Sequence, residues 1–429
     1  MSEAETTNAA PADRILEAAR DRLATGGFRD LTFRPLAEAS GATVAALTYH
    51  FGSKRALIER LVAAEREADA ARHAAFAARF ADLPRLEPAA IAALLEAYLD
   101  EAAGSARTTS LIWCELLLAA VNDVEVRDLA APWIAARRAF WRALFEGRAE
   151  TPKAWAEAAM GYVTDETAHS LVQSDDPDYR LLRRMTLERL ASRGVNLGLS
   201  DPTFFETMVR RLDPAVALPT PSAQEPYAGR ALAIALAAGE LIVARGADGV
   251  THRAVGEQAD TPASSVAYHF RTRLDLLRAG LTVIYRVAQG RLAPRPDPAE
   301  MEAFVVRGTV SIALAAAREP DLRPFAVDLR RLRGENLRWR ASERLNIEVD
   351  LCAAQTASVA RMGAILLAGA AGEPPPGRRH RGLDPRPGEL NNRSVGRHFR
   401  RKTVAKISHN CFPETLAGPL EGAGPSHRG

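Results

Sequence analysis

The feature that most constrains this chain of 429 residues is an internal repeat. Residues 250–277 align with residues 31–58 at a constant offset of 219 and without a gap. An ungapped repeat of this length indicates that the chain carries the same structural module twice. Seven positions are identical in the two copies: Thr32/Thr251, Arg34/Arg253, Glu38/Glu257, Tyr49/Tyr268, His50/His269, Phe51/Phe270 and Leu57/Leu276.

The first copy has the pattern of two short helices joined by a tight turn and followed by a longer helix. Thr32 and Ser53 are placed to cap helices, and Gly41 stands where the chain has to turn. Apolar residues recur at spacings of three and four, as the buried side of a helix requires. The segment therefore predicts a helix-turn-helix. In the second copy Asp260 stands at the turn and Pro262 opens the second helix.

Both copies resemble the DNA-binding head of the TetR family of bacterial transcriptional regulators. The family's signature, Leu-Tyr-x-His-Phe followed by a small linker and Ser-Lys, stands here as LTYHFGSK in residues 47–54 and as VAYHFRTR in residues 266–273. The tyrosine position of the family holds Thr48 and Ala267. The resemblance implies a three-helix head followed by an all-helical body that binds a ligand and dimerises.

The resemblance also implies that a recognition helix enters the major groove, where outward side chains reach base edges while neighbouring helices bind phosphates. Each histidine in these segments could instead be structural, and each cation a solvated surface charge. In the first head the expected DNA contacts are Arg34, Thr43, Ala45, Ala46, Thr48, Tyr49, His50 and Lys54. In the second head the equivalent residues are Arg253, Pro262, Ser264, Ser265, Ala267, Tyr268, His269 and Arg273.

The rest of the chain is mostly helical in pattern. Aromatic and polar side chains spread over the first body could line a ligand pocket, or could be core and surface residues of a bundle. The ligand candidates are Tyr98, Trp113, Trp141, Tyr162 and His169. Helices are expected at residues 88–103, 107–121, 124–147, 153–173, 178–193 and 201–212, and again near 298–317, 321–341 and 343–370.

These patterns divide the chain into two units with an added tail. The second body ends early, because the residues after 372 have no helical pattern. The tail has 11 Lys and Arg against 5 Asp and Glu, a net charge of +6, and is either a basic arm for DNA or a disordered terminus. The expected segments are a leader at 1–10, a head at 11–60, a body at 61–212, a linker at 213–228, a head at 229–289, a truncated body at 290–372 and a tail at 373–429.

Composition limits the classes of function that remain. A net charge of +3 means that DNA binding has to come from local patches, because the chain as a whole is no polycation. Three cysteines that lie far apart, Cys114, Cys352 and Cys411, suggest neither a disulfide framework nor a metal cluster. No signal peptide or membrane span is expected. We therefore expect a cytoplasmic protein without a cofactor.

Catalysis is the rival class. Asp165, Glu166 and His169 stand at i, i+1 and i+4 of one expected helix, a spacing that could serve a metal or an acid–base pair. A metal site needs three or four ligands, and no partner cluster is evident in the sequence, so a solvated helix face is the preferred interpretation.

The sequence thus predicts an all-α, non-enzymatic regulator made of two TetR-like units. The resemblance implies a repressor that binds double-stranded DNA at a near-palindromic operator and is released by a small apolar or aromatic ligand. Two chains are expected to form a homodimer through residues 153–193, with an intrachain pseudo-dimer as the other arrangement. The alternative function is a ligand-binding or protein-interaction module in which one head, more readily the second, has lost DNA binding.

Overall fold

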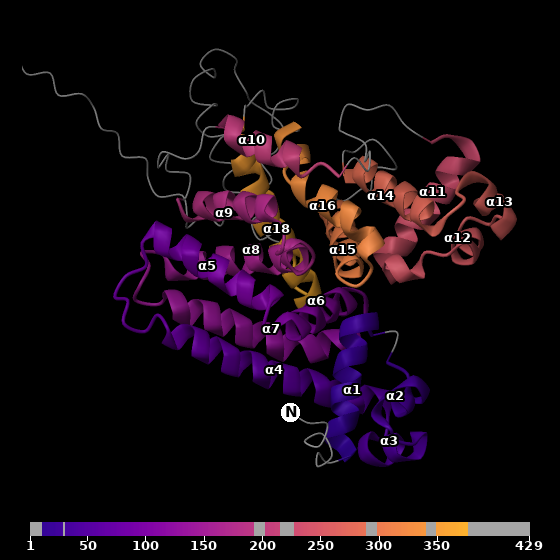
Figure 1. Ribbon diagram of the computed structural model, residues 1–429, viewed down its shortest axis with the longest axis horizontal. Coiled ribbons are helices and arrows are strands. Elements are labelled where there is room, and N and C mark those ends of the chain that lie inside the picture. The colour runs from indigo at the N-terminus through magenta and orange to yellow at the C-terminus, as the bar shows by residue number, and fades with distance from the viewer. Residues whose placement is uncertain are drawn as a thin grey trace, which may run out of the picture.

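The computed structural model describes residues 11–28, 31–192, 202–214, 227–288, 298–339 and 349–375. Every regular element within these residues is a helix, which confirms the predicted all-α class (Figure 1). The predicted leader, residues 215–226 of the linker and the tail from residue 376 lie outside the described residues.

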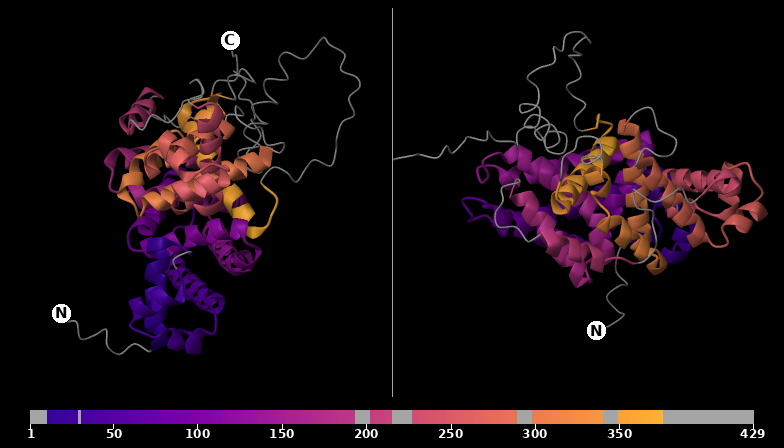
Figure 2. Two further views of the ribbon diagram at one scale, coloured as in Figure 1. Left: turned by 90° about the vertical axis from the view of Figure 1, so that its right-hand side faces the viewer. Right: turned by 90° about the horizontal axis from the view of Figure 1, so that it is seen from above.

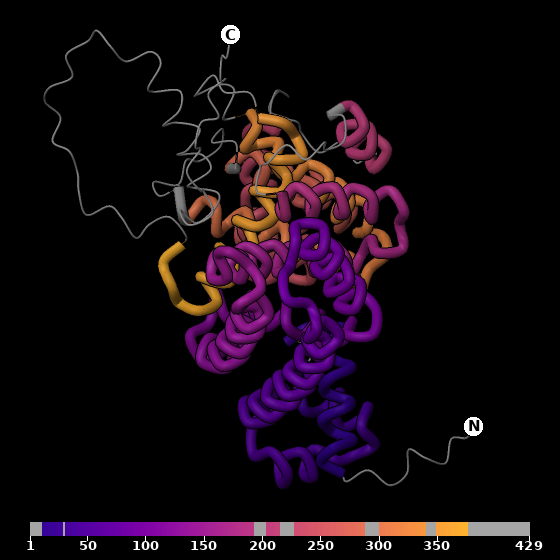
Figure 3. Tube along the Cα trace, turned by 90° about the vertical axis from the view of Figure 1, so that its left-hand side faces the viewer, coloured from indigo at the N-terminus to yellow at the C-terminus, as the bar shows by residue number. Residues whose placement is uncertain are grey.

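The first head consists of α1 (Pro11–Gly26), α2 (Phe33–Ser40), α3 (Val44–Phe51) and the start of α4 (Lys54–Ala78). Gly41 ends α2 with φ of 63°, a left-handed conformation that glycine adopts without strain. The hydroxyl oxygens of Thr43 and Ser53 accept hydrogen bonds from the backbone at the starts of α3 and α4. The three helices stand away from the rest of the molecule, and α4 runs from them into the body (Figure 3).

The second repeat copy forms the equivalent helices, α11 (Gly229–Arg245), α12 (His252–Gln258), α13 (Ala263–His269) and α14 (Arg273–Ala288). Asp260 takes the place of Gly41 and has φ of 47°. Aspartate is one of the few residues other than glycine that enters this left-handed region readily. The turn between α12 and α13 is therefore kept although its glycine is absent. We call α11–α14 the second head.

The first body holds α5 (Pro88–Ala103), α6 (Arg107–Asn122), α7 (Val124–Phe145), α8 (Pro152–Gln173), α9 (Pro177–Ala191) and α10 (Pro202–Arg211). Each end lies within two residues of the predicted helix, because proline and acidic residues mark most of the N-terminal ends in the sequence. The existence of all six predicted helices is confirmed.

The second body begins with α15 (Pro298–Ala316) and ends with α18 (Leu351–Ala371). Between them, the expected single helix at 321–341 is wrong: α16 (Arg323–Arg331) stops early, and residues 335–339 form a separate helical stretch. The break is centred on Gly334, which has φ of 83° and passes so close to α18 that an added Cβ would lie 2.5 Å from the backbone of Ala354. Tertiary packing interrupts the helix there.

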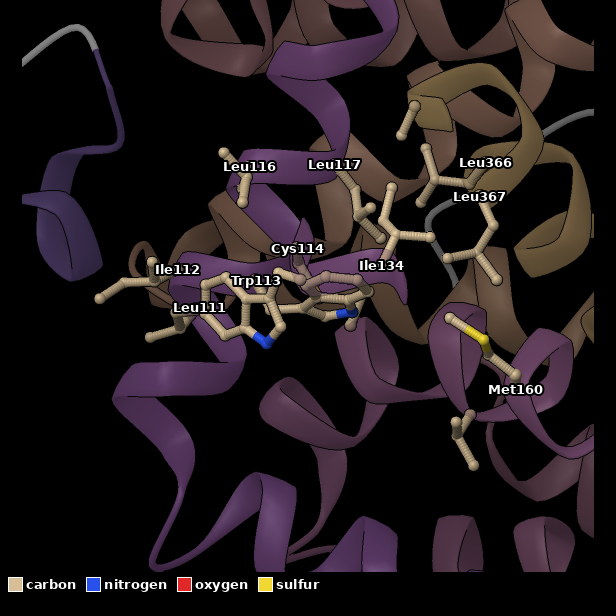
Figure 4. Close-up of a cluster of buried hydrophobic side chains, with 14 of the residues drawn as sticks. Leu111, Ile112, Trp113, Cys114, Leu116, Leu117, Ile134, Met160, Leu366 and Leu367 are labelled. Carbon is tan, nitrogen blue, oxygen red and sulfur yellow. The ribbon is translucent and has the colours of Figure 1, made fainter. Parts of the chain in front are cut away.

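The two bodies form one core around the crossing of α8 and α18, which is the most extensive helix–helix contact in the described chain. At the crossing, a Cβ added to Gly161 would lie 2.6 Å from the carbonyl oxygen of Ala360, and one added to Gly363 would collide with the carbonyl of Gly161. Figure 4 shows Leu366 and Leu367 of α18 facing side chains of α6, α7 and α8 in a single apolar cluster.

This packing has two consequences for the sequence-based expectations. All residues of α8 from Ala154 to Gln173 except Glu157 are buried, so the first helix of the segment 153–193, expected to pair two chains, is covered within one chain. The helix α18 is long and apolar enough to cross a membrane, but 67% of its most apolar window is buried in the fold. It serves as a core helix here. The two heads project from the joined bodies (Figures 1 and 2).

Candidate nucleic-acid interface

The predicted recognition helix, α3, has a buried side and an exposed side. Leu47 and Phe51 are buried in the core of the head, whereas Tyr49 is 86% exposed. Thr48 is exposed as well, and its hydroxyl donates to the carbonyl oxygen of Val44 at 3.0 Å, which leaves the oxygen as a hydrogen-bond acceptor. The predicted base-facing residues follow the same pattern: Thr43, Ala45 and Thr48 are exposed, and Ala46 is half-buried.

The residues predicted to bind phosphates surround this exposed side. Arg34 is almost fully exposed, and its contact with Glu38 on the next turn is long, at 3.8 Å. Such an exposed pair contributes little free energy, so the guanidinium can exchange partners. Lys54 is exposed at the N-terminus of α4, with its ammonium 3.3 Å from the carbonyl oxygen of Phe28. His50 is half-buried and contacts the ring of Tyr49 edge to face at 5.2 Å.

In the second head, α13 also has one buried and one exposed side. Val266 and Phe270 are buried, and Tyr268 is 83% exposed. The start of α13 differs, because Pro262 occupies the N-cap position and supplies no side-chain hydrogen bond. Of the remaining predicted contacts, Ser264, Ala267 and His269 are exposed and Ser265 is half-buried.

The charged residues of the second head have closer partners than those of the first. Arg253 contacts Glu257 at 2.9 Å, although both side chains remain mostly exposed. Arg273, the equivalent of Lys54, donates to Glu319 at 2.6 Å and approaches Asp248 at 3.3 Å. Burial and the neighbouring Glu319 raise the pKa of Asp248. The structure thus places Arg273 in a cluster with two carboxyl groups.

Arg318 and Glu319, at the end of α15, connect the two heads. Arg318 donates to the carbonyl oxygen of Ala24 at 2.7 Å and to Glu115 of α6 at 2.6 Å, while Glu319 holds Arg273 of the second head. We call this contact the head junction. A cavity of about 150 Å³ lies beside it, between the C-terminal ends of α1 and α11 and the neighbouring parts of α6 and α15.

The five predicted ligand residues are all buried in the first body, and their role in ligand binding stays a prediction. All are at most 1% exposed, and none lines the cavities found between the heads, in the second body or between α4 and α7. Tyr98 lies 4.9 Å from the ring of Trp141, and Trp113 lies 5.3 Å from Trp133. Three of the five therefore pack against other aromatic rings.

A groove between α4 and α7 carries polar groups that the sequence reasoning did not single out. Its volume is about 210 Å³, and its lining includes Asp69, His73 and Phe140. The ring of His73 stacks on Phe140 at 4.0 Å, and Asp69 accepts hydrogen bonds from Trp133 and Arg137. The spacing of Asp69 and His73 on the apolar side of α4 was a usable signal, since charged residues are rarely placed on such a side without a partner.

Burial and pairing change the protonation of this groove. Burial, with the positive charges of Arg137 and Arg72, lowers the pKa of His73 to about 3, so its imidazole is neutral at physiological pH. Burial by itself would raise the pKa of Asp69, but the positive charges of Arg137 and Arg72, joined at low pH by protonated His73, outweigh it and lower that pKa below its usual value. The groove therefore presents a neutral histidine beside an ionised aspartate.

The cluster Asp165, Glu166 and His169 is not the solvated face that the sequence suggested. All three are fully buried, because α8 is covered on every side by helices from both halves of the chain. Glu166 accepts from Arg330 at 2.9 Å, and Asp165 accepts from Arg333 at 2.9 Å. These carboxylates join α8 to the second body. Their partners lie more than 160 residues away, where no local pattern reveals them.

Comparison with known families supports the first head. Residues 15–61 match the family model described as bacterial regulatory proteins, tetR family. The matched residues run from α1 into α4 and include all of α3. No curated protein matches the chain significantly. The family match supports a DNA-binding transcriptional regulator in general terms.

Proposed function

We propose that this protein is a cytoplasmic, ligand-responsive repressor that binds double-stranded DNA through α3 and α13. The observation that carries the proposal is the exposed side of α3, within the segment that matches the family model. Leu47 and Phe51 fix the helix to its head, and Thr43, Ala45 and Thr48 are left to face bases. Threonine can accept or donate a hydrogen bond, and its methyl group and that of alanine fit a thymine methyl.

The DNA backbone would be bound at the edges of α3. Arg34 and Lys54 are exposed cations, and Lys54 stands in the first turn of α4, where the helix dipole also favours an anion. Tyr49 and His50 lie at the end of α3 nearest to Lys54. Phosphate contacts of this kind fix the register of a protein on DNA but carry no sequence information themselves.

The groove between α4 and α7 is a further candidate site for ligand response, beside the five buried residues predicted from the sequence. An aromatic ligand could stack in the groove beside Phe140 and His73, and Asp69 would favour a ligand with a hydrogen-bond donor. Because α4 also begins in the first head, a ligand that displaces α4 would move α3 relative to the body.

The test is DNA binding by the intact chain to duplexes recovered by selection from a random-sequence library, measured by fluorescence anisotropy at several salt concentrations. Arg34→Ala and Lys54→Ala should weaken binding to all sequences alike and each lower the salt slope by about 1. Thr48→Ala should instead relax sequence preference. Arg180→Ala, an exposed arginine on α9 far along the body, is the matched control for loss of one charge.

Two results would count against the proposal. If no duplex is enriched even at low salt, the chain is no sequence-specific regulator, and a ligand-binding or protein-interaction module replaces it. If Arg34→Ala and Lys54→Ala bind DNA as well as Arg180→Ala does, α3 and its neighbours are not the DNA-binding surface.

A further inference from the structure

We infer that one chain is a complete DNA-binding unit, in which the two unlike heads bind one DNA site with two half-sites of different sequence. The inference rests on the proposed function and extends it, since two chains on a near-palindromic site were the expectation. Three observations carry it: the internal symmetry of the packing, the use of α8 within the chain, and the pattern of identity and difference between the recognition helices.

The helix contacts of one half are repeated in the other. The helix α1 packs on α6 as α11 packs on α15, and α6 packs on α18 as α15 packs on α8. Two glycines at the ends of α1 and α11 show the same relation. A Cβ added to Gly27 would lie 3.0 Å from Glu115 of α6, and one added to Gly246 would lie 3.1 Å from Ser311 of α15. These contacts are related by exchange of the halves, with α8 and α18 at the centre, whereas the contacts of α5 with α8 and α9 have no counterpart among the described residues of the second half.

The part of the expected dimer surface that lies on α8 is already occupied at this centre. On one side α8 contacts α5 and α7, and on the other it contacts α15, α16 and α18. The fully buried pair of Glu166 and Arg330 closes the contact between the halves. Removing one member of such a pair leaves a buried charge without its partner, so the contact is specific and costly to open.

Both heads remain free to bind DNA in this arrangement. In Figure 1 the first head lies below the joined bodies and the second head to their right, with α3 and α13 at their outer parts and the head junction between them. The exposed Tyr49 and Tyr268 mark the open side of each recognition helix. Each predicted recognition helix thus keeps an exposed side, and on a bipartite site the two would occupy successive major grooves.

The two heads share residues predicted to contact the DNA backbone and differ in those predicted to face bases. The shared positions are Arg34/Arg253, Tyr49/Tyr268 and His50/His269. The base-facing positions differ without exception: Thr43/Pro262, Ala45/Ser264, Ala46/Ser265 and Thr48/Ala267.

The difference between the base-facing residues of the two heads predicts two different half-sites in the DNA. Backbone contacts position a head on any sequence, whereas hydrogen bonds to base edges select the sequence. Where the first head offers hydroxyl groups at Thr43 and Thr48, the second offers them at Ser264 and Ser265, at other steps of the helix. The two heads can therefore approach DNA in the same way but cannot prefer the same bases. The resulting site is bipartite and asymmetric.

The test uses the full chain and the duplexes recovered by selection from a random library. Light scattering of the complex should give one chain per duplex, and the selected sequence should contain two unlike half-sites about one helical turn apart. Thr48→Ala should lower discrimination at one half-site by about fivefold and leave the other unchanged, and Ser264→Ala should do the reverse. The hydroxyl-retaining variants Thr48→Ser and Ser264→Thr should keep most of the discrimination, and circular dichroism should confirm that each variant is folded.

Two chains per duplex, a symmetric selected site, or loss at the same half-site in both variants would overturn this inference and leave the regulator intact. If no sequence is selected at any salt, the proposed function fails instead. The two failures are distinguishable because the first requires bound DNA and the second requires its absence.

Discussion

The two heads have the same helices but different electrostatic surroundings. In the first head, Lys54 lies exposed at the start of α4 and contacts only a backbone carbonyl among the described residues. In the second head, Arg273 at the equivalent position is held by Glu319 and Asp248, and its side chain is 34% exposed. A cation paired with carboxylates presents less positive potential to a phosphate than a free one does.

The difference shows that a repeated residue type does not guarantee a repeated role. Arg273 keeps the charge of Lys54 but uses it to attach the second head to α15, through a residue next to Arg318 in the head junction. If both heads bind DNA, the first should supply most of the affinity and the second should add mainly sequence preference.

The largest effect is expected from a substitution that removes the buried ion pair between the two bodies. Arg330→Met leaves Glu166 buried without its cation, and we expect it to lower the free energy of unfolding by about 3 to 5 kcal/mol. Urea denaturation followed by circular dichroism measures the loss. The double variant Glu166→Gln with Arg330→Met removes both charges and should recover most of it. Equal losses in the single and double variants would show that shape, and not charge, dominates at this contact.

The halves should also respond to pH with opposite signs. His73 in the first body has a pKa of about 3 in the folded state against an ordinary 6.5, so its contribution to stability is complete above pH 6.5 and is lost as the pH falls toward 3. Asp328 in the second body has a pKa raised by burial to about 6, so its contribution is present at low pH and is lost as the pH rises from 3.8 to 6.

Urea midpoints measured across this range for His73→Gln and Asp328→Asn, each against the unchanged protein, separate the two effects. The difference between Asp328→Asn and the unchanged protein should grow in favour of the variant between pH 4 and 6. The stability of His73→Gln should depend less on pH below 6.5 than that of the unchanged protein. A constant difference over the whole range would contradict the assigned pKa values.

A smaller loss is expected at the crossing of α8 and α18. Gly363→Ala adds a methyl group against the carbonyl of Gly161, and we expect it to lower stability by about 1 to 3 kcal/mol. Alanine is otherwise the better helix former by about 1 kcal/mol, so the two effects oppose each other and thermal unfolding reports their balance. A rise in the melting temperature would mean that the helices can move apart at this point without cost.

The smallest expected effect is on DNA binding, and it comes from removing the equivalent cation of each head. Lys54→Ala should weaken DNA binding by about 1 kcal/mol, which is about fivefold, and lower the salt slope by about 1. Arg273→Ala should change the salt slope much less, because its charge is already balanced by Glu319 and Asp248. Anisotropy titrations at 50 and 200 mM salt test both. If the salt slopes of DNA binding are equal for the two variants, the two heads do not differ electrostatically in the way described.

Local patterns predicted the helices of this protein well. Capping residues, prolines and apolar spacing placed α5 to α10 within two residues, and the repeat located α11 to α14 from α1 to α4. They did not predict the partners of Asp165 and Glu166, because Arg333 and Arg330 lie far along the chain. A usable signal was present in α8 itself, whose small and apolar residues on all sides are typical of a fully buried helix.

Local patterns also could not distinguish core from pocket at the candidate ligand residues. Tyr98, Trp113 and Trp141 were chosen as aromatic residues on several helices, but aromatic rings fill a core as readily as they line a pocket, and only packing decides between the two. The groove between α4 and α7 depends on three-dimensional neighbours such as His73 and Phe140, which come from helices well separated in the sequence.

The contact of Gly161 with Gly363 also has a consequence for folding during synthesis of the chain. Its two residues are separated by 202 positions (363 − 161), so at about 5 to 20 residues per second a ribosome completes α8 roughly 10 to 40 s before the matching turn of α18 exists. During that interval the side of α8 that packs on α18 lacks this partner, although α5, α6 and α7 have already been made. Once α18 is made, the two helices meet within one molecule, so their association does not depend on how many copies a cell contains.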